Sequence, residues 1–301
     1  MNQPSVRDSI RVAVPCAHSK YVMESLGQIL VAGLAHPIAI GDADLISKTA
    51  SVCGVPMDRL EVIHADDEDD ALGRAVQLAR EGNAEVIMKG HLHTDALLSA
   101  ILNRSSGLRT GRRLSHIYHI TGIGMRPLLI TDSGVNIAPD VAIKCEILRN
   151  AVAFANTMGN SRPRVAILSA TEAPSMQMPS SVEARAVMEF AEAESLKCVA
   201  FGPIALDCAL SEAAAAAKGL TTEVAGNADI LLVPNLETGN VLSKFIVHVM
   251  GGIAAGFVTG ANIPLIVPSR ADSPAARVKA VKLAVSGIHR ARDSKARQGT
   301  S

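Results

Sequence analysis

The sequence predicts an α/β fold in which mainly parallel sheets are flanked by helices and divided between two domains. Short β-branched runs alternate with helical patterns of about ten to twenty residues along the chain, and such βαβ units place consecutive strands parallel. Nine strand-like runs are more than one sheet comfortably holds, and 301 residues suit two domains of about 100–200 residues. Hydrophobic residues make up 48% of the chain, which supplies material for buried cores and argues against disorder.

The predicted strands are apolar runs bounded by turn residues. They cover residues 11–15, 37–40, 61–65, 85–88, 128–132, 164–169, 198–201, 229–234 and 264–268. Apolar side chains three or four positions apart predict helices between them, for example over 21–34 and 141–157, and a long helix that reaches about residue 259. The acidic run 66–70 precedes a helical pattern, so it is interpreted as a solvated helix start. The alternating segment 114–122 predicts a hairpin or an inserted strand.

Composition and charge exclude several classes of function. The chain has 29 basic and 29 acidic residues and a formal net charge of +0, which argues against a nucleic-acid partner. Aromatic residues make up only 2%, too few for base-stacking platforms. Charged or turn residues interrupt every apolar run before the roughly 18 residues that a membrane-spanning helix needs, so no membrane association is expected.

The N-terminal segment and the cysteines predict a cytoplasmic protein. No long apolar stretch follows a basic start, so no secretory signal is expected. The cysteines are scattered without a Cys-x-x-Cys pair, as is typical of reduced and mostly buried thiols. They are Cys16, Cys53, Cys145, Cys198 and Cys208.

Four junctions between a predicted strand and the following helix carry unusual polar residues, and ligands of parallel sheets bind beyond the carboxyl ends of strands. In the first junction, Lys89 and Gly90 follow a strand, and Thr94 is placed to cap the next helix, which makes a plausible anion cradle. His91 and His93 alternate as on an extended segment, but no acidic or cysteine companion for a metal stands nearby. A capped turn with a surface lysine is the competing interpretation.

The second junction places Asp132 and Asn136 on a loop before a helix that begins near Asp140. Here a buried aspartate that ties the loop together is the alternative to a substrate contact. The third junction contains Thr238, Gly239 and Asn240, where glycine permits a close approach of the backbone and free amides suit an anion. An ordinary capping turn is its alternative.

The fourth junction presents Ser269, Arg270 and Asp272 at the end of a strand. Ser273 and Pro274 form a good helix start, with the serine as cap and the proline in the first helical position. An arginine at such a strand end can hold a phosphate or acyl-phosphate oxygen with its forked guanidinium.

Taken together, these stretches resemble the phosphate acyltransferase family of phosphate acetyltransferases and phosphate butyryltransferases. The similar stretches follow the family order and cover nearly the whole chain: MKGHLHT at 88–94, GLRTGR at 107–112, TDSGVNIAPD at 131–140, FGPIALDCALS at 201–211, GNADILLVPNLETGN at 226–240 and PSRADS at 268–273. The lysine-glycine version of the first stretch and the SRADS version of the last are more similar to the butyryltransferase branch.

The resemblance implies a two-domain α/β subunit related to isocitrate and isopropylmalate dehydrogenases, with the active site in the interdomain cleft. The domains expected on this basis are residues 1–139 plus 260–301, and residues 140–259. The resemblance also implies homodimers or larger assemblies, acyl-CoA and phosphate as substrates, and no metal or redox cofactor. The implied reaction interconverts acyl-CoA plus phosphate with acyl phosphate plus CoA by direct transfer in a ternary complex.

The resemblance also implies residue roles. Ser269 and Arg270 are similar to the family's Ser-Arg pair, which acts on the thioester and the phosphate, and Asp272 joins them as a catalytic candidate. The family's proposed base is an aspartate seven residues beyond the serine, where this chain has Ala276. The candidate substrate-binding residues are Lys89, His93, Thr94, Arg109, Arg112, Asp132, Asn136, Thr238, Gly239 and Asn240.

Two other classes of function stay open at this point. A metal-dependent two-domain dehydrogenase needs a cluster of aspartates for a divalent ion, and the sequence does not assemble one. A non-catalytic protein that binds CoA or acyl phosphate is suggested by Ala276 in place of the base.

Overall fold

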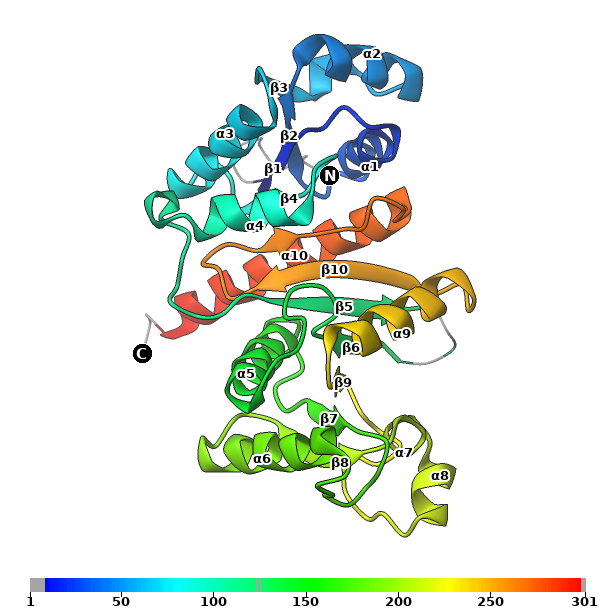
Figure 1. Cartoon of the computed structure of the whole chain (residues 1–301). Coiled ribbons are helices and arrows are strands. Elements are labelled where there is room, and N and C mark those ends of the chain that lie inside the picture. Colours follow the sequence, from blue (N-terminus) through cyan, green and yellow to red (C-terminus); the bar gives the residue numbers. More distant parts are fainter. Residues whose placement is uncertain (1–8, 123, 125, 299–301) are drawn as a thin grey trace. The chain divides into compact units, whose positions relative to one another are not determined.

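The computed structural model describes residues 9–122, 124 and 126–298, and the chain divides into two compact units. Unit 1 combines Met1–Arg112 with Ala255–Ser301, and unit 2 is the continuous segment Arg113–Ala254 (Figure 1). The discontinuous arrangement was expected, but the first boundary falls after Arg112 rather than after residue 139. The reason is that the strand at 128–131 pairs inside unit 2, so it cannot belong to unit 1.

Unit 1 is built on a mainly parallel sheet with the strand order β3-β2-β1-β4-β11-β10. Its strands are β1 (Arg11–Pro15), β2 (His36–Gly41), β3 (Glu61–His64), β4 (Val86–Met88), β10 (Ile253–Thr259) and β11 (Leu265–Ile266). Only the pairing of β10 with β11 is antiparallel among these. The carboxyl ends of β1, β4 and β11 therefore meet at one edge of this sheet.

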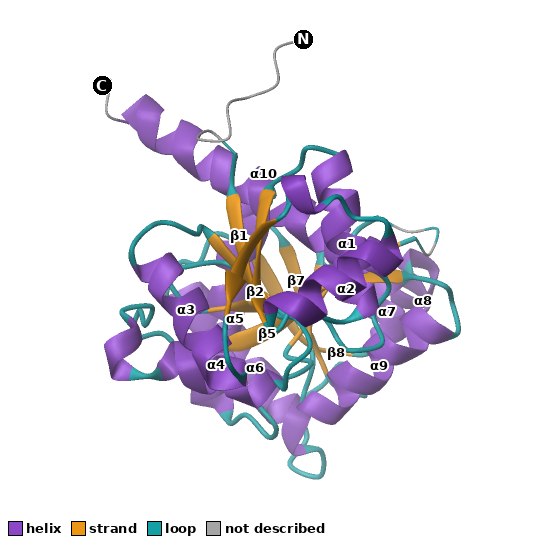
Figure 2. Cartoon of the chain, turned by 90° about the horizontal axis from the view of Figure 1, so that it is seen from above, coloured by secondary structure: helices purple, strands orange, loops and turns teal. Residues whose placement is uncertain are grey.

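The helices of unit 1 cover both faces of that sheet. They are α1 (Lys20–Val31), α2 (Ala43–Cys53), α3 (Glu68–Arg80), α4 (Thr94–Leu102) and α10 (Pro274–Gln298), with short 3₁₀ turns η1 (Met57–Arg59) and η2 (Arg104–Ser106). Figure 2 shows β1 and β2 between α3 on one side and α1 and α2 on the other, in agreement with the contacts of these elements. The acidic run does start a helix, because the Asp67 side chain caps α3 by accepting the N–H of Asp70 at 2.8 Å.

One secondary-structure prediction is wrong. Residues 253–259 form strand β10 and not the end of a long helix, which already stops at His248. Gly251 takes a positive φ of 72° after the helix, a conformation that ends helices and favours glycine. β10 then gains backbone hydrogen bonds by pairing with β11, a tertiary contact that the local pattern does not encode.

Unit 2 holds the strands in the order β5-β6-β9-β7-β8, again with mainly parallel pairing. Its strands are β5 (Ser115–Thr121), β6 (Leu128–Thr131), β7 (Arg164–Leu168), β8 (Val199–Ile204) and β9 (Ile230–Leu232). β5 pairs antiparallel with β6, so the alternating segment is the inserted strand that the sequence predicts. The other pairings in this unit are parallel.

Alternating side chains of these strands build two cores, one on each face of the sheet. The helices are α5 (Val141–Thr157), α6 (Pro179–Ala193), α7 (Leu206–Leu210), α8 (Glu212–Ala217) and α9 (Leu236–His248). Ile117, Val165 and Ile230 pack with α5 and α6, whereas Ala166 and Leu231 pack with α7, α8 and α9. Across the described parts of both units, no helix combines the length and apolar character needed to cross a bilayer.

Candidate active site

The loops that follow β4 and β11 start side by side in unit 1, because these strands are parallel neighbours. The N–H of Lys89 donates to the carbonyl oxygen of Ile266 at 2.8 Å, so the pairing continues one residue past β4. We call residues 89–93 and 267–273 the strand-end loops of unit 1. They carry Lys89, His93, Ser269, Arg270 and Asp272.

Lys89 is buried and turned into its own loop. Its side chain is 2% exposed, and Nζ donates to the carbonyl oxygen of Leu92 at 3.0 Å. Burial, followed by the cations of Arg277 and Arg270, lowers the pKa of Lys89 to about 8. The sequence places Lys89 correctly at a strand end, but the surface lysine of the competing interpretation is excluded.

Ser269 and Asp272 form a closed turn in the second strand-end loop. The Ser269 N–H donates to Oδ2 of Asp272 at 2.7 Å, and the Asp272 N–H donates to the Ser269 carbonyl oxygen at 3.1 Å. Asp272 is buried, Ser269 is half-buried and Arg270 is exposed. The turn therefore presents the serine and the arginine while the aspartate holds the backbone. As predicted, α10 begins at Pro274, directly after Ser273.

The predicted cap of α4 is wrong by one position. His93 occupies the N-cap and Thr94 is the first helical residue, and no side chain caps this end. His93 is exposed and Thr94 is half-buried, so both side chains stand at an open helix start. Arg109 and Arg112 are exposed on the segment before unit 2.

In unit 2, Asp132 organises the loop that follows β6. Its Oδ1 accepts the N–H groups of Gly134 at 2.8 Å and Val135 at 2.9 Å, and Oδ2 accepts the Asn136 side-chain amide at 2.6 Å. Asn136 also donates to the Leu114 carbonyl oxygen at 2.9 Å. Both side chains are buried. They form the loop-tying arrangement that was the alternative to a substrate contact.

The start of α9 lies against this loop. Asn235 caps α9, and its Oδ1 accepts both the N–H of Thr238 at 2.9 Å and the Thr238 hydroxyl at 2.6 Å. A Cβ on Gly239 would lie 2.7 Å from the Asp132 carbonyl oxygen and 2.8 Å from the Ser133 hydroxyl. The close approach that the glycine permits is therefore to the chain's own loop.

Thr238 and Asn240 differ from Gly239 in exposure. Thr238 is exposed and Asn240 is half-buried, whereas Gly239 is buried. Of the third predicted junction, two side chains thus stay accessible and the glycine serves local packing.

The sequence patterns did not indicate two notable side chains at these strand ends, Arg277 and His18. Arg277 is buried and donates to the carbonyl oxygens of Lys89 and Ser269. The sequence feature that could have indicated Arg277 is its position on a face of α10 that is otherwise apolar and carries Ala280 and Ala284. The His18 and His91 rings stack edge to face with their centroids 5.6 Å apart, and burial followed by His91 lowers the pKa of His18.

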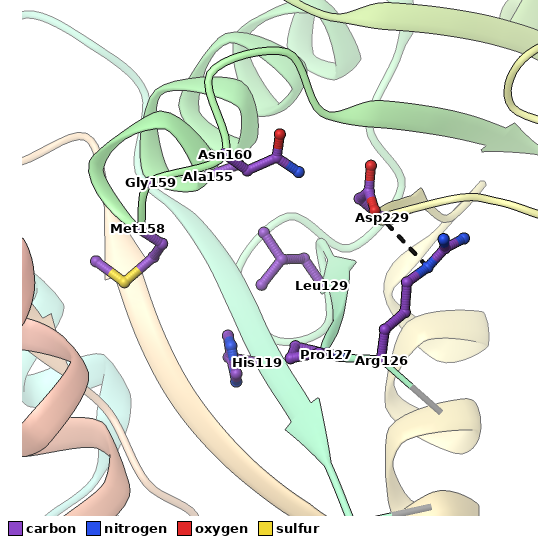
Figure 3. Close-up of a pocket in the computed structure, with 9 residues that line it drawn as sticks. All are labelled: His119, Arg126, Pro127, Leu129, Ala155, Met158, Gly159, Asn160 and Asp229. Atoms are coloured by element: carbon purple, nitrogen blue, oxygen red, sulfur yellow. Dashed lines mark ion pairs between the residues drawn. The ribbon is translucent and has the colours of Figure 1, made fainter. Parts of the chain in front are cut away.

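A cavity of about 360 Å³ in unit 2 lies at the opposite strand ends, where β6 and β9 begin (Figure 3). Asp229 pairs there with Arg126 at 3.7 Å and with Arg164 at 2.9 Å. Burial acts to raise the pKa of Asp229, but the hydrogen bonds from Arg164 outweigh it and the pKa lies below its ordinary value. The predicted site residues do not line this cavity.

Glu172, Asp207 and Cys208 are a group of potential metal ligands found among the described residues. The Lys218 ammonium already pairs with Glu172 at 2.9 Å and with Asp207 at 3.2 Å. A lysine in this place supplies the positive charge that a metal ion would bring. The group is an ion-pair network and not the aspartate cluster that a dehydrogenase needs.

Comparison with known proteins identifies the family. The family described as Phosphate acetyl/butaryl transferase matches residues 66–285. The chain is 39% identical over 286 residues to the phosphate acetyltransferase of Rhizobium meliloti, covering 93% of this chain and 88% of the relative. It is 37% identical over 276 residues to the phosphate butyryltransferase of Clostridium acetobutylicum, covering 91% and 92%.

Solved structures agree with this assignment. A branched-chain phosphotransacylase from Enterococcus faecalis V583 superposes with a TM-score of 0.83 at 28% identity, covering 93% of this chain and 99% of that one. A 4-hydroxythreonine-4-phosphate dehydrogenase from Klebsiella pneumoniae reaches 0.59 at 12% identity, covering 93% and 99%, which shows a shared dehydrogenase-like fold alone. On these grounds the chain belongs to the phosphate acetyl/butaryl transferase family.

Proposed function

We propose that this chain catalyses the reversible reaction of an acyl-CoA with inorganic phosphate to give an acyl phosphate and CoA. Membership of the family supports the reaction class. The structural observation that carries the proposal is the parallel pairing of β4 with β11, which brings Lys89, Ser269 and Arg270 to one sheet edge. Cations there suit a phosphate, and a hydroxyl suits a carbonyl oxygen that becomes negative.

The proposed chemistry is direct transfer in a ternary complex. A phosphate oxygen attacks the thioester carbonyl, the C–O bond forms, the C–S bond breaks, and CoA leaves as a thiolate that takes up a proton. Arg270, exposed at the end of its loop, holds the phosphate with two guanidinium donors. Ser269 donates a hydrogen bond to the carbonyl oxygen as negative charge develops on it.

In the reverse direction the CoA thiol must lose its proton before it attacks. A free thiol has a pKa of about 8.5, which nearby cations lower. Lys89 and Arg270 supply such a field at this edge. We propose that this field takes the place of the carboxylate base that the chain lacks at Ala276.

The other predicted residues divide by accessibility. We assign substrate contact to the exposed or half-buried side chains at helix starts and on the arginine-rich segment, namely His93, Thr94, Arg109, Arg112, Thr238 and Asn240. Asp132 and Asn136 instead shape the loop after β6, in which both are buried, and Gly239 is buried in the first turn of α9 where it packs against that loop. We further propose a cytoplasmic enzyme that uses no metal or redox cofactor, in keeping with its five free cysteines.

We also propose that the chain acts as a homodimer, with an apolar stripe on α9 as the contact. Val241, Phe245 and Val249 lie four residues apart and are 68%, 53% and 67% exposed. Together they expose on the order of 300 Å², which is within the range of the largest apolar patches on single chains, and such patches often serve a function. A two-fold contact would double this area, giving much of the apolar part of a standard interface of about 1,600 Å².

Light scattering on the purified protein tests the dimer. We expect twice the chain mass of 31.4 kDa, and dissociation in Phe245→Glu. Tyr21→Glu, which places the same charge on an exposed aromatic position of α1, should leave the dimer intact. A monomeric wild type would contradict the proposal.

Phosphate-dependent release of CoA thiol from a series of acyl-CoAs, with and without a chelator, tests the reaction. We expect turnover that needs phosphate, survives the chelator and is largest for one short acyl chain. Arg270→Gln should lose most of this turnover. Arg59→Gln should keep it, because Arg59 lies just before the start of β3, at the end of the sheet opposite the strand-end loops. Tight CoA binding without turnover would instead favour a binding protein, and turnover abolished by the chelator would favour a metal enzyme.

A further inference from the structure

Arg277 joins two separate loops from inside the protein. It lies in the first turn of α10 and is 2% exposed. Nη2 donates to the Ser269 carbonyl oxygen at 3.1 Å, and Nη1 lies 3.4 Å from the Lys89 carbonyl oxygen, at the long end of hydrogen-bond range. Its Nε has no partner among the described residues. One guanidinium therefore ties the backbone after β4 to the backbone after β11.

The residue type matters for this connection. An arginine has two terminal nitrogens in a rigid plane and can reach two acceptors at once, whereas a lysine has a single Nζ. Buried charges cost several kcal/mol of desolvation, and an apolar side chain usually fills a core position with less penalty. The neighbours of Arg277 on this helix face are Ala280, Val281 and Ala284. Stability alone therefore does not account for an arginine here.

Arg277 also belongs to the charged surroundings of Lys89. After burial, Arg277 is the strongest cause that lowers the pKa of Lys89 to about 8, followed by Arg270. Asp272, in the loop after β11, and Glu68, at the start of α3, act in the opposite direction. Arg277 thus affects both where Lys89 lies and how readily it keeps its proton.

We infer that Arg277 is a positioning residue of the acyl transfer: it holds Lys89 and Ser269 in a fixed mutual geometry, without itself touching substrate. This inference rests on the proposed function, in which Lys89 contributes to the cationic field at the sheet edge and Ser269 donates to the thioester carbonyl oxygen. A displacement of about 1 Å between such groups lowers turnover roughly 10²-fold. Because the link runs through backbone atoms, neither loop can shift without breaking it.

Two substitutions separate geometry from charge. Arg277→Lys keeps the buried charge but loses the fork, so kcat should fall about 10²-fold with little change in KM for acyl-CoA and with an unchanged pH profile. Arg277→Met removes the charge as well, so the pH above which KM for phosphate rises should move to a higher value than in wild type. Arg11→Lys is the control, since Arg11 pairs with Glu61 at 2.9 Å at the opposite strand ends. It should keep kcat and the pH profile.

The outcomes are distinguishable. If wild type shows no turnover, the proposed function fails. If wild type is active and the folded Arg277→Lys variant keeps kcat within about threefold of it, the inference about Arg277 fails and the proposed function stands. The reason is that replacing a merely structural arginine changes the melting temperature but not the turnover of the folded enzyme. Arg277→Lys decides the matter by itself should Arg277→Met not fold.

Discussion

The backbone N–H of Ser269 donates to the carboxylate of Asp272 at 2.7 Å. Asp272 is 6% exposed and accepts this bond from within its own loop. A carboxylate that holds a backbone amide is poorly placed to take a proton from a thiol. The geometry therefore favours a role of Asp272 in shaping the turn that presents Ser269.

We expect Asp272→Ala to lower the free energy of unfolding by about 1.5–3 kcal/mol, because it removes the charge-assisted hydrogen bond that the half-buried Ser269 N–H donates. Asp272→Asn keeps an acceptor oxygen and should restore part of this stability. Denaturant unfolding measures both, and thiol-release kinetics measure turnover. A large loss of kcat in a fully stable Asp272→Asn would instead restore Asp272 as a catalytic candidate.

Ser269→Ala should reduce kcat by about 10²–10³-fold while both substrates still bind, because one donor to the developing oxyanion is lost. Ser273→Ala is the matched control. It removes the serine just before α10 and should lower stability by about 1 kcal/mol with kcat retained. Acyl-enzyme trapped on Ser269 with labelled acyl-CoA in the absence of phosphate would overturn direct transfer.

Lys89 makes phosphate use dependent on pH. Because burial lowers its pKa to about 8, Lys89 loses its positive charge as the pH rises through that value. KM for phosphate should therefore rise above about pH 8, while KM for acyl-CoA changes less. Lys89→Met should have a raised KM for phosphate at all pH values and lack this dependence. An unchanged KM in folded Lys89→Met would leave the residue a structural role only.

The lowered pKa of Lys89 also predicts how the stability of the folded state changes with pH. The folded state releases the Lys89 proton near pH 8 and the unfolded chain near its ordinary pKa of 10.5, so burial of the charged form costs roughly 3 kcal/mol below pH 8. Lys89→Met should thus gain stability relative to wild type at pH 7, and the gain should shrink towards pH 10. Lys20→Met, at an exposed position of α1, should show no such trend.

Gly239→Ala should destabilise unit 2 by about 1–3 kcal/mol, because its Cβ meets the backbone oxygen of Asp132. Gly73→Ala is the opposite control. Gly73 lies inside α3 with no atom near its ideal Cβ, so alanine there should add about 0.5–1 kcal/mol. Thermal unfolding of both variants compares them directly. An unaltered melting temperature of Gly239→Ala would show that the loop after β6 can move aside.

The sequence could predict the alternation of strands and helices and the strand ends that carry polar side chains, because both follow from local patterns. It could not predict β10, since that strand depends on pairing with β11. The boundary after Arg112 also depended on pairing, in this case of β6 with β9.

For the site, sequence position indicated which residues stand at strand ends but not where their side chains point. Lys89 turns inward because the Leu92 carbonyl oxygen accepts its ammonium group, and Asp132 turns inward because four donors of its own loop surround it. Arg277 was missed for a related reason. Its partners are main-chain oxygens, which have no signature in a sequence.

The discontinuity of unit 1 has a consequence for biosynthesis. While the chain emerges from the ribosome, β4 has no neighbour on one side until Leu265–Ile266 is made, and Arg277 follows later still. Unit 2 is continuous, so all of its strands are available before that point. The sheet edge that carries Lys89 therefore stays open through most of translation, and a nascent or truncated chain exposes an unpaired strand there. The strand-end loops become linked only when the last helix packs.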